Sequence, residues 1–157
     1  MTISRTFLSA AVIGAVALST MTFSATAQQA NPAVEARQGY MQVMSLNIGV
    51  LGQMARGNTD YDAEAAQIAA DNLVTLTQIN QSFFWPQGTD TDTIEGTRAL
   101  PAIWADFPGV IEVSTQYATA VAGLSGVAGD GLDAMRTALG PVGTACGACH
   151  DDYRQPR

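Results

Sequence analysis

Apolar side chains recur at steps of three and four residues along most of the chain after residue 30, which is the spacing of amphipathic α-helices. No stretch of this region alternates apolar and polar residues in the way that predicts a β-strand. Four helical segments result, at about residues 32–56, 63–83, 107–125 and 133–153, and residues 84–100 form a polar loop. The pattern therefore predicts an all-α fold of four helices.

Capping residues indicate where these helices begin. Asn31 precedes a proline at the start of the first helix, Asp60 or Asp62 precedes the second, and Asp106 precedes the third. Before the third helix, residues 101–104 are expected to form a short turn of their own.

Each helix carries one apolar face that is expected to be buried. The faces consist of Met41, Met44, Ile48, Leu51 and Ala55; of Leu73, Leu76 and Phe83; of Val110, Val113, Tyr117, Ala120 and Leu124; and of Leu132, Met135, Leu139, Val142, Cys146, Cys149 and Tyr153. The fourth face repeats at alternating steps of three and four residues over its whole length, which is the spacing of a helix-bundle interface. The sequence therefore predicts a four-helix bundle with both cysteines pointing inward. Pro141 removes one hydrogen bond of this last helix and is expected to bend it without ending it.

The motif that carries chemistry is the segment Cys146–His150, which contains both cysteines and the only histidine of the chain. Its Cys-x-x-Cys-His spelling is the attachment signature of c-type haem, in which two thiols add to the vinyl groups and the imidazole binds the iron. A redox dithiol would open a helix after a strand, and a zinc ion would need a fourth ligand. The motif predicts one covalent haem c with His150 as axial ligand, and Arg154 is a candidate contact at the haem edge.

Methionine is the usual second axial ligand where a second histidine is lacking. Met135 precedes His150 by fifteen residues on the same helix, about 22 Å along its axis, and cannot reach the opposite haem face. Met54 lies near the far end of the first helix. Met41 and Met44 remain as candidates, although both also suit the role of core fillers.

Arg37 lies one helical turn before Met41 and therefore shares its face. An arginine on an apolar face needs an anionic partner, and its planar fork suits the carboxylates of the haem propionates. Gln38 is expected to add a hydrogen bond. The alternative for Arg37 is a solvent-exposed pair with Glu35 or Asp71.

The N-terminal residues resemble a secretory signal peptide. Arg5 precedes an apolar run over residues 7–18, and Ala25-Thr26-Ala27 has the form of a cleavage site. The run is shorter than the roughly 20 residues of a membrane span, which disfavours an anchor. We therefore expect residues 1–27 to be cleaved and residues 28–157 to form one periplasmic domain.

Acidic residues dominate the charge of the chain, with 14 Asp and Glu against 7 arginines, no lysine and a net charge of −7. A surface of this sign disfavours binding to nucleic acid or to anionic membranes and suits a basic protein partner. No cluster of a base and a nucleophile accompanies the motif, so an enzyme is not expected.

With these residues the chain resembles the class II c-type cytochromes of the cytochrome c′ family over nearly the whole region after the signal. The matching segments are Arg37–Met41, Tyr61-Asp62, Pro86-x-Gly88-Thr89, Pro101-x-Ile103-Trp104 and Cys146–Arg154, of which the last is the most specific. The resemblance implies an antiparallel four-helix bundle with haem near the C-terminus, often paired as a homodimer through the first two helices.

The resemblance also assigns roles to single residues. It implies that Arg37 and Gln38 contact the haem propionates, that Thr97 and Arg98 contribute weaker haem contacts, and that Met41 lies on the distal face.

Two functions follow from the resemblance, because the family divides at the position of Met41. In low-spin relatives similar to cytochrome c-556 this methionine ligates the iron and the protein carries electrons. In cytochromes c′ proper the iron is five-coordinate and high-spin and binds nitric oxide or carbon monoxide. Gly147, where many cytochromes c′ have lysine, is typical of the low-spin relatives. We therefore expect an electron carrier with His150 and Met41 as ligands, and a gas-binding protein is the alternative.

Two expectations concern the first helix. Val43 and Met54 are expected to be exposed on it, as contacts of a homodimer. Tyr40 points away from Met41 by helix phase, so this helix offers no distal hydrogen-bond donor, which favours neutral diatomic ligands over dioxygen.

Overall fold

The computed structural model describes residues 31–156, and the expected signal peptide at residues 1–27 lies outside this range. The described residues form α1 (Pro32–Ala55), α2 (Ala63–Thr77), α3 (Ala102–Ala105), α4 (Phe107–Ser125) and α5 (Leu132–Tyr153). Within residues 31–156, β-type pairing is limited to an isolated antiparallel bridge between Ala99 and Arg154. None of the described helices combines the length and apolar character that a membrane crossing needs.

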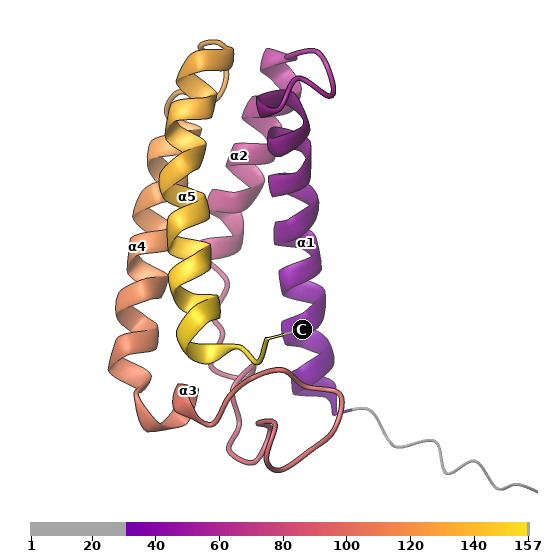
Figure 1. Ribbon diagram of the computed structural model, residues 1–157, viewed down its shortest axis with the longest axis vertical. Coiled ribbons are helices and arrows are strands. Elements are labelled where there is room, and N and C mark those ends of the chain that lie inside the picture. Colours follow the sequence, from indigo (N-terminus) through magenta and orange to yellow (C-terminus); the bar gives the residue numbers. More distant parts are fainter. Residues whose placement is uncertain (1–30, 157) are drawn as a thin grey trace, which may run out of the picture.

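The four long helices lie side by side and alternate in direction along the chain (Figure 1). α4 packs along α5, α1 packs along α2, α2 packs against α4, and α1 contacts α5. The loop over residues 78–101 and the short α3 lie at the end of the bundle where α5 ends (Figure 1). The predicted antiparallel four-helix bundle is confirmed, and α3 is the short turn expected before the third long helix.

The predicted helix starts are confirmed by their capping hydrogen bonds. The side chains of Asn31, Asp62 and Asp106 accept backbone N–H groups in the first turns of α1, α2 and α4 at 3.0–3.3 Å. Each such cap contributes about 1 kcal/mol to helix stability. Asp62, and not Asp60, is the cap of α2.

The expected end of the second helix is wrong. α2 ends at Thr77, and Phe83, which was expected on its buried face, is 87% exposed. Side chains in this region bond to the local backbone and compete with helix formation. Asn80 Oδ1 accepts the N–H of Ser82 at 3.0 Å, which turns the chain out of the helical path.

The last helix passes through its proline. α5 is continuous from Leu132 to Tyr153, and Pro141 is solvent-exposed within it. The prediction that Pro141 does not end the helix is confirmed.

The core consists of two apolar clusters. The larger runs along the bundle, and its largest fully buried side chains are Leu51, Leu73, Val121, Leu124, Met135 and Val142. The smaller lies at the end where α5 ends and is built on Ile103, Val110 and Tyr153, with Trp85, Trp104 and Cys149 packed against it. The cysteine-bearing end of α5 is therefore held by the second cluster.

The outer face of α1 differs from expectation at one position. Val43 is exposed as expected, but Met54 is only 5% exposed and belongs to the larger cluster, so its predicted exposure is wrong. Met54 follows Leu51 by three residues and therefore shares its buried face. Leu46 and Val50 are the apolar residues that stand on the exposed face beside Val43.

Candidate haem site

The cysteines and the histidine lie in the last two turns of α5. Cys146 and Cys149 are three residues apart and share one helical face, and His150 lies beside them. Cys146 packs against the larger cluster and Cys149 against the smaller, and both thiols are free. The inward orientation predicted for both cysteines is confirmed. A Cβ atom at Gly147, between them, would meet no other atom within 4 Å, so that side of α5 is open.

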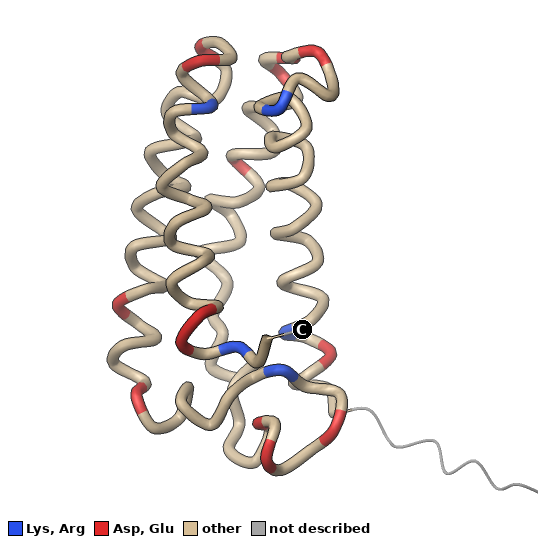
Figure 2. The backbone as a smooth tube through the Cα atoms, viewed as in Figure 1, with Lys and Arg blue, Asp and Glu red and all other residues tan. Residues whose placement is uncertain are grey.

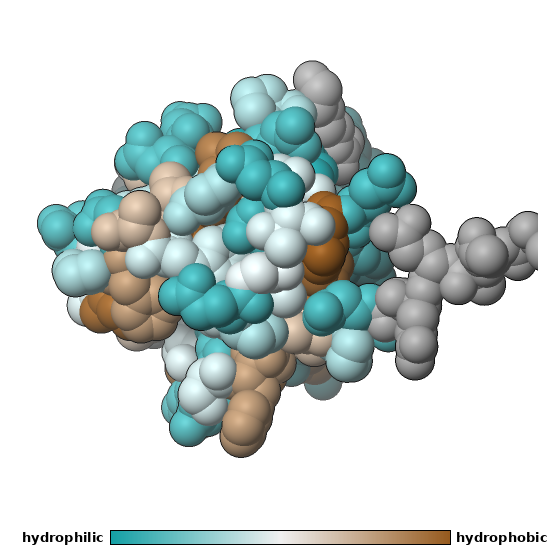
Figure 3. All heavy atoms as spheres, turned by 90° about the horizontal axis from the view of Figure 1, so that it is seen from below, coloured by the Kyte–Doolittle hydropathy of each residue, from teal (hydrophilic) through white to brown (hydrophobic). Residues whose placement is uncertain are grey.

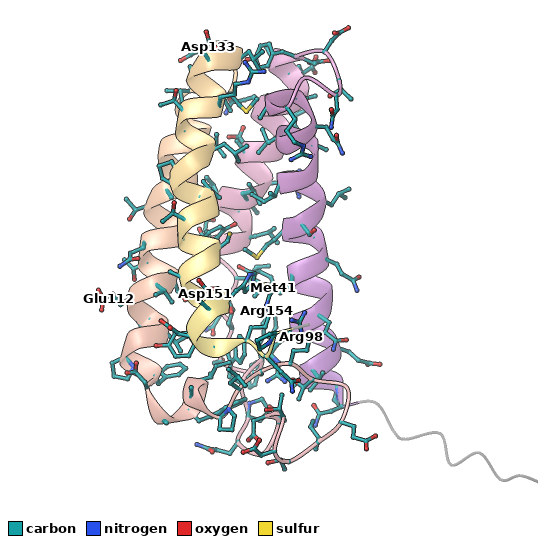
Figure 4. The ribbon with its side chains drawn as sticks, in the orientation of Figure 1. Met41, Arg98, Glu112, Asp133, Asp151 and Arg154 are labelled. Carbon is teal, nitrogen blue, oxygen red and sulfur yellow. The ribbon has the colours of Figure 1, made fainter. Side chains whose placement is uncertain are left out.

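The surroundings of His150 favour the neutral form of its imidazole. Burial lowers its pKa, and the charges of Arg154 and Arg98 lower it further, against the smaller opposite effect of Asp151. Figure 4 shows Arg98 and Arg154 close together beside the end of α5. Neutral imidazole is the form that binds metals, so this setting suits an iron ligand.

A hydrogen bond near the opposite end fixes how α1 and α5 are aligned. Arg136 Nε donates to the Ala55 carbonyl oxygen at 2.6 Å. Met41 lies fourteen residues from Ala55 along α1, and His150 lies fourteen residues from Arg136 along α5, in the same direction along the bundle. Both are about 21 Å from that contact at 1.5 Å per residue. Met41 and His150 therefore lie at the same level of the bundle.

The two candidate methionines have different surroundings. Met44 packs against the larger cluster, as the core-filler interpretation predicts. Met41 is 38% exposed although it shares that face. Figure 4 shows Met41 on the side of α1 toward α5, at about the height of Asp151. Its thioether thus lies on the side of α1 toward α5, at about the level of His150.

Arg37 is buried and binds the loop over residues 78–101. Its Nη1 donates to the Phe84 carbonyl oxygen at 3.2 Å and to Thr89 Oγ1 at 2.9 Å. Its Nη2 donates to the Thr89 carbonyl oxygen at 2.9 Å and to Thr97 Oγ1 at 3.2 Å. All four terminal N–H groups are therefore used within the protein.

Two tryptophans complete the surroundings of Arg37. Its guanidinium carbon lies 4.9 Å from the Trp85 ring centroid and 5.9 Å from that of Trp104, in cation–π geometry. Burial lowers the pKa of Arg37. The alternative prediction, a solvent-exposed ion pair between Arg37 and Glu35 or Asp71, is wrong. Arg37 is only 5% exposed, and its side chain is turned toward the loop.

The other predicted contact residues join the same loop to the chain end. Gln38 Nε2 donates to the Gly96 carbonyl oxygen at 2.7 Å, next to Thr97. Arg98 Nε donates to the Gln155 carbonyl oxygen at 3.0 Å. The structure therefore gathers Arg37, Gln38 and Thr97 at the start of α1, and Arg98 and Arg154 at the end of α5.

Sequence reasoning missed several residues of this end of the bundle. Thr89 and Trp85 were not expected as partners of Arg37, and their only signal was membership in a loop motif with proline and glycine. Asp106 was expected as a helix cap but not as the acceptor of the Tyr153 hydroxyl at 2.9 Å. That hydrogen bond, with some burial, raises the pKa of Tyr153 to about 12.

The residues present fit a covalently bound haem. Two free thiols share the inward face of one helix, an imidazole whose lowered pKa favours its neutral form follows them, and a thioether lies at the level of that imidazole. In addition, the Tyr117 hydroxyl is buried without a hydrogen-bond partner among the described residues. It lies near enough to the Cys146 thiol for that group to influence its pKa. Such a donor set offers attachment, iron ligation and an unused polar group in one region.

The family comparison agrees with this geometry, because residues 32–154 match the family model described as Cytochrome C′. The chain belongs to the cytochrome c′ family. Its cofactor is therefore haem c, bound covalently near the C-terminus, as in the family.

Relatives carry two kinds of name. This cytochrome is 40% identical over 146 residues to a cytochrome c′ of Cereibacter sphaeroides. The alignment covers 93% of this chain and 98% of that one. It is 36% identical over 129 residues to a cytochrome c-554 of the same organism, with 82% and 97% covered.

Solved structures share the fold. A cytochrome c′ from Rhodobacter has a TM-score of 0.79 and 42% identity, over 80% of this chain and 97% of that one. A ferrous variant of the Alcaligenes xylosoxidans cytochrome c′ with bound nitric oxide has a TM-score of 0.68 and 30% identity, over 80% and 94%. A further cytochrome c′, described as having a ligand-controlled dimer dissociation, has a TM-score of 0.71 and 25% identity, over 80% and 95%.

Proposed function

We propose that this cytochrome is a periplasmic electron carrier in which His150 of α5 and Met41 of α1 are the two axial ligands of the haem iron. The observation that carries the proposal is the alignment of α1 and α5, which places Met41 at the level of His150. When bound, haem supplies a one-electron couple between ferric and ferrous iron, and thioether ligation raises its potential.

Each residue of the site has a distinct part in this proposal. Cys146 and Cys149 attach the porphyrin to α5, and His150 offers a neutral imidazole whose orientation the helix fixes. Met41 offers a thioether without lining the core, since it is 38% exposed. A mature domain at residues 28–157, exported after cleavage at residue 27, is part of the same proposal.

The arginines are proposed to act at the propionate edge in two ways. Arg98 and Arg154 lie beside His150 and are proposed as direct partners of a carboxylate. Arg37 already uses its four terminal N–H groups on the loop, so we propose that it acts there mainly through its charge and by holding Thr97 in place. Gln38 is proposed to contribute a polar contact at the same edge.

Substitution of Met41 tests the axial ligation. The native ferric protein is expected to show a low-spin absorption spectrum, and Met41→Ala is expected to give a high-spin spectrum and a lower reduction potential. Met44→Ala is the matched control, since Met44 packs against the core, and it should lower stability but leave the spectrum low-spin.

The opposite result would favour the second candidate function. A native high-spin spectrum that Met41→Ala leaves unchanged would contradict ligation and support a five-coordinate protein that binds nitric oxide or carbon monoxide. The specific observation behind this alternative is the similar solved structure with bound nitric oxide.

The surface around the end of α5 suits a basic redox partner. Figure 2 shows acidic positions around this end. Asp106 caps the start of α4, Glu112 follows in α4, and Asp151 and Asp152 lie in the last turn of α5. Figure 3 views the same end and shows apolar residues among hydrophilic ones. Phe107 and Ile111 of α4 are 46% and 52% exposed there. An apolar patch beside acidic residues is suited to a partner with a basic rim.

Electron exchange with small redox complexes tests this charge. Asp151→Asn with Asp152→Asn is expected to lower the rate constant with a cationic complex several-fold at low ionic strength, and salt should abolish the difference. Asp60→Asn with Asp130→Asn removes the same charge from the loops at the other end of the bundle and is the matched control. Equal effects of the two pairs would contradict steering toward the haem end.

A further inference from the structure

The hydroxyl of Tyr117 is an unusual polar group in this bundle. Tyr117 lies in α4, is 9% exposed and belongs to the larger apolar cluster. Among the buried side-chain oxygen and nitrogen atoms of residues 31–156, its hydroxyl oxygen alone has no hydrogen-bond partner. Buried polar groups in proteins are nearly always hydrogen-bonded, so we expect this hydroxyl to have a hydrogen-bond partner that is not part of the protein chain.

The alignment of α4 and α5 places this hydroxyl beside the haem attachment point. Tyr153 Oη donates to Asp106 Oδ2, which sets these two positions at one level. Tyr117 lies eleven residues from Asp106 along α4, and Val142 lies eleven residues from Tyr153 along α5. Helical side chains lean toward the N-terminus of their helix, which in α4 is the haem end. The Tyr117 ring therefore extends from the level of Val142 toward Cys146.

Electrostatics agree with this placement. Burial raises the pKa of the Tyr117 hydroxyl, and the nearby ionisable side chains of Cys146 on α5 and Tyr40 on α1 act in the same direction. The hydroxyl is thus near both helices that supply the proposed iron ligands. It stays protonated at neutral pH and can donate a hydrogen bond.

Protein groups nearby do not use this donor. The Tyr40 hydroxyl already donates to the Leu76 carbonyl oxygen at 3.1 Å. A thioether sulfur at Cys146 would be a weak acceptor. A small ligand in the haem site would supply a better one.

We propose that the Tyr117 hydroxyl is a hydrogen-bond donor to diatomic ligands bound in the haem site whenever the sixth iron position is open. The inference rests on the proposed haem site and adds a specificity-determining residue to it. The expectation that the first helix supplies no distal donor is unaffected, because Tyr117 belongs to α4. Ligands with a charged or strongly polarised outer atom would gain most from such a donor.

Infrared spectroscopy of the ferrous carbon monoxide adduct tests the proposal in the Met41→Ala background, where the sixth position is open in either ligation state. Donation to the CO oxygen lowers the C–O stretching frequency, so adding Tyr117→Phe is expected to raise it. The same change should speed CO dissociation by roughly two- to tenfold, the factor of one net hydrogen bond. Tyr40→Phe is the matched control and should change neither quantity, because its hydroxyl is bound to Leu76.

An unchanged stretching frequency and dissociation rate in Tyr117→Phe would overturn the proposal. A second measurement avoids this substitution: the C–O frequency of the Met41→Ala protein should shift between H₂O and D₂O, and no shift would also overturn it. The spectrum of the native ferric protein reports separately on Met41 ligation. Failure of that ligation therefore leaves the test of Tyr117 intact.

Discussion

Replacing both Cys146 and Cys149 with alanine is expected to abolish covalent haem attachment, so that the unfolded protein loses its colour and the mass of the macrocycle. These are the only cysteines of the chain, and each thiol forms one carbon–sulfur bond to a vinyl group. Their shared inward face on α5 means that both bonds form on one side of a single helix. Loss of the haem also removes a ligand that stabilises the folded state.

Mass spectrometry under denaturing conditions measures this result directly. The single variants Cys146→Ala and Cys149→Ala are the controls, since each keeps one thiol and is expected to retain the mass of haem through one bond. A double variant that still carries the macrocycle after denaturation would show that the attachment assigned to α5 is wrong.

Replacing Arg37 with leucine is expected to lower the free energy of unfolding by about 3 to 5 kcal/mol, because it breaks a buried hydrogen-bond network. The substitution removes the four hydrogen bonds that Arg37 donates to the loop and leaves the buried Thr89 carbonyl without its donor. It also removes the cation that lies over Trp85. The melting temperature of the haem-bound protein should fall by roughly 10 °C or more.

Two variants show whether the guanidinium fork is responsible. Arg37→Lys keeps the charge but cannot reproduce the paired donors, so it should recover only part of the loss. Arg56→Leu removes an exposed arginine from the end of α1 and should change stability by less than about 0.5 kcal/mol. A loss below about 1 kcal/mol for Arg37→Leu would contradict the role of this residue as anchor of the loop.

Local sequence signals were sufficient where a structural feature depends on neighbours within one or two helical turns. Asn31 and Asp106 cap their helices as predicted, since a cap needs only the next three backbone N–H groups. The inward face of Cys146 and Cys149 follows from helical periodicity alone. Even here competition between local interactions misled the prediction, since hydrogen bonds around Asn80 end α2 before Phe83.

The amino-acid sequence by itself determined an all-α bundle, its helix starts and a haem attachment motif on its last helix. Tertiary structure alone decided that Met41 lies at the level of His150 and that Arg37 is buried by a loop some fifty residues away in the chain. It also decided that the Tyr117 hydroxyl has no hydrogen-bond partner among the described residues. The physical reason is range. Periodicity and capping act over a few residues of one helix, whereas alignment between helices and the burial of polar groups depend on how distant segments pack together.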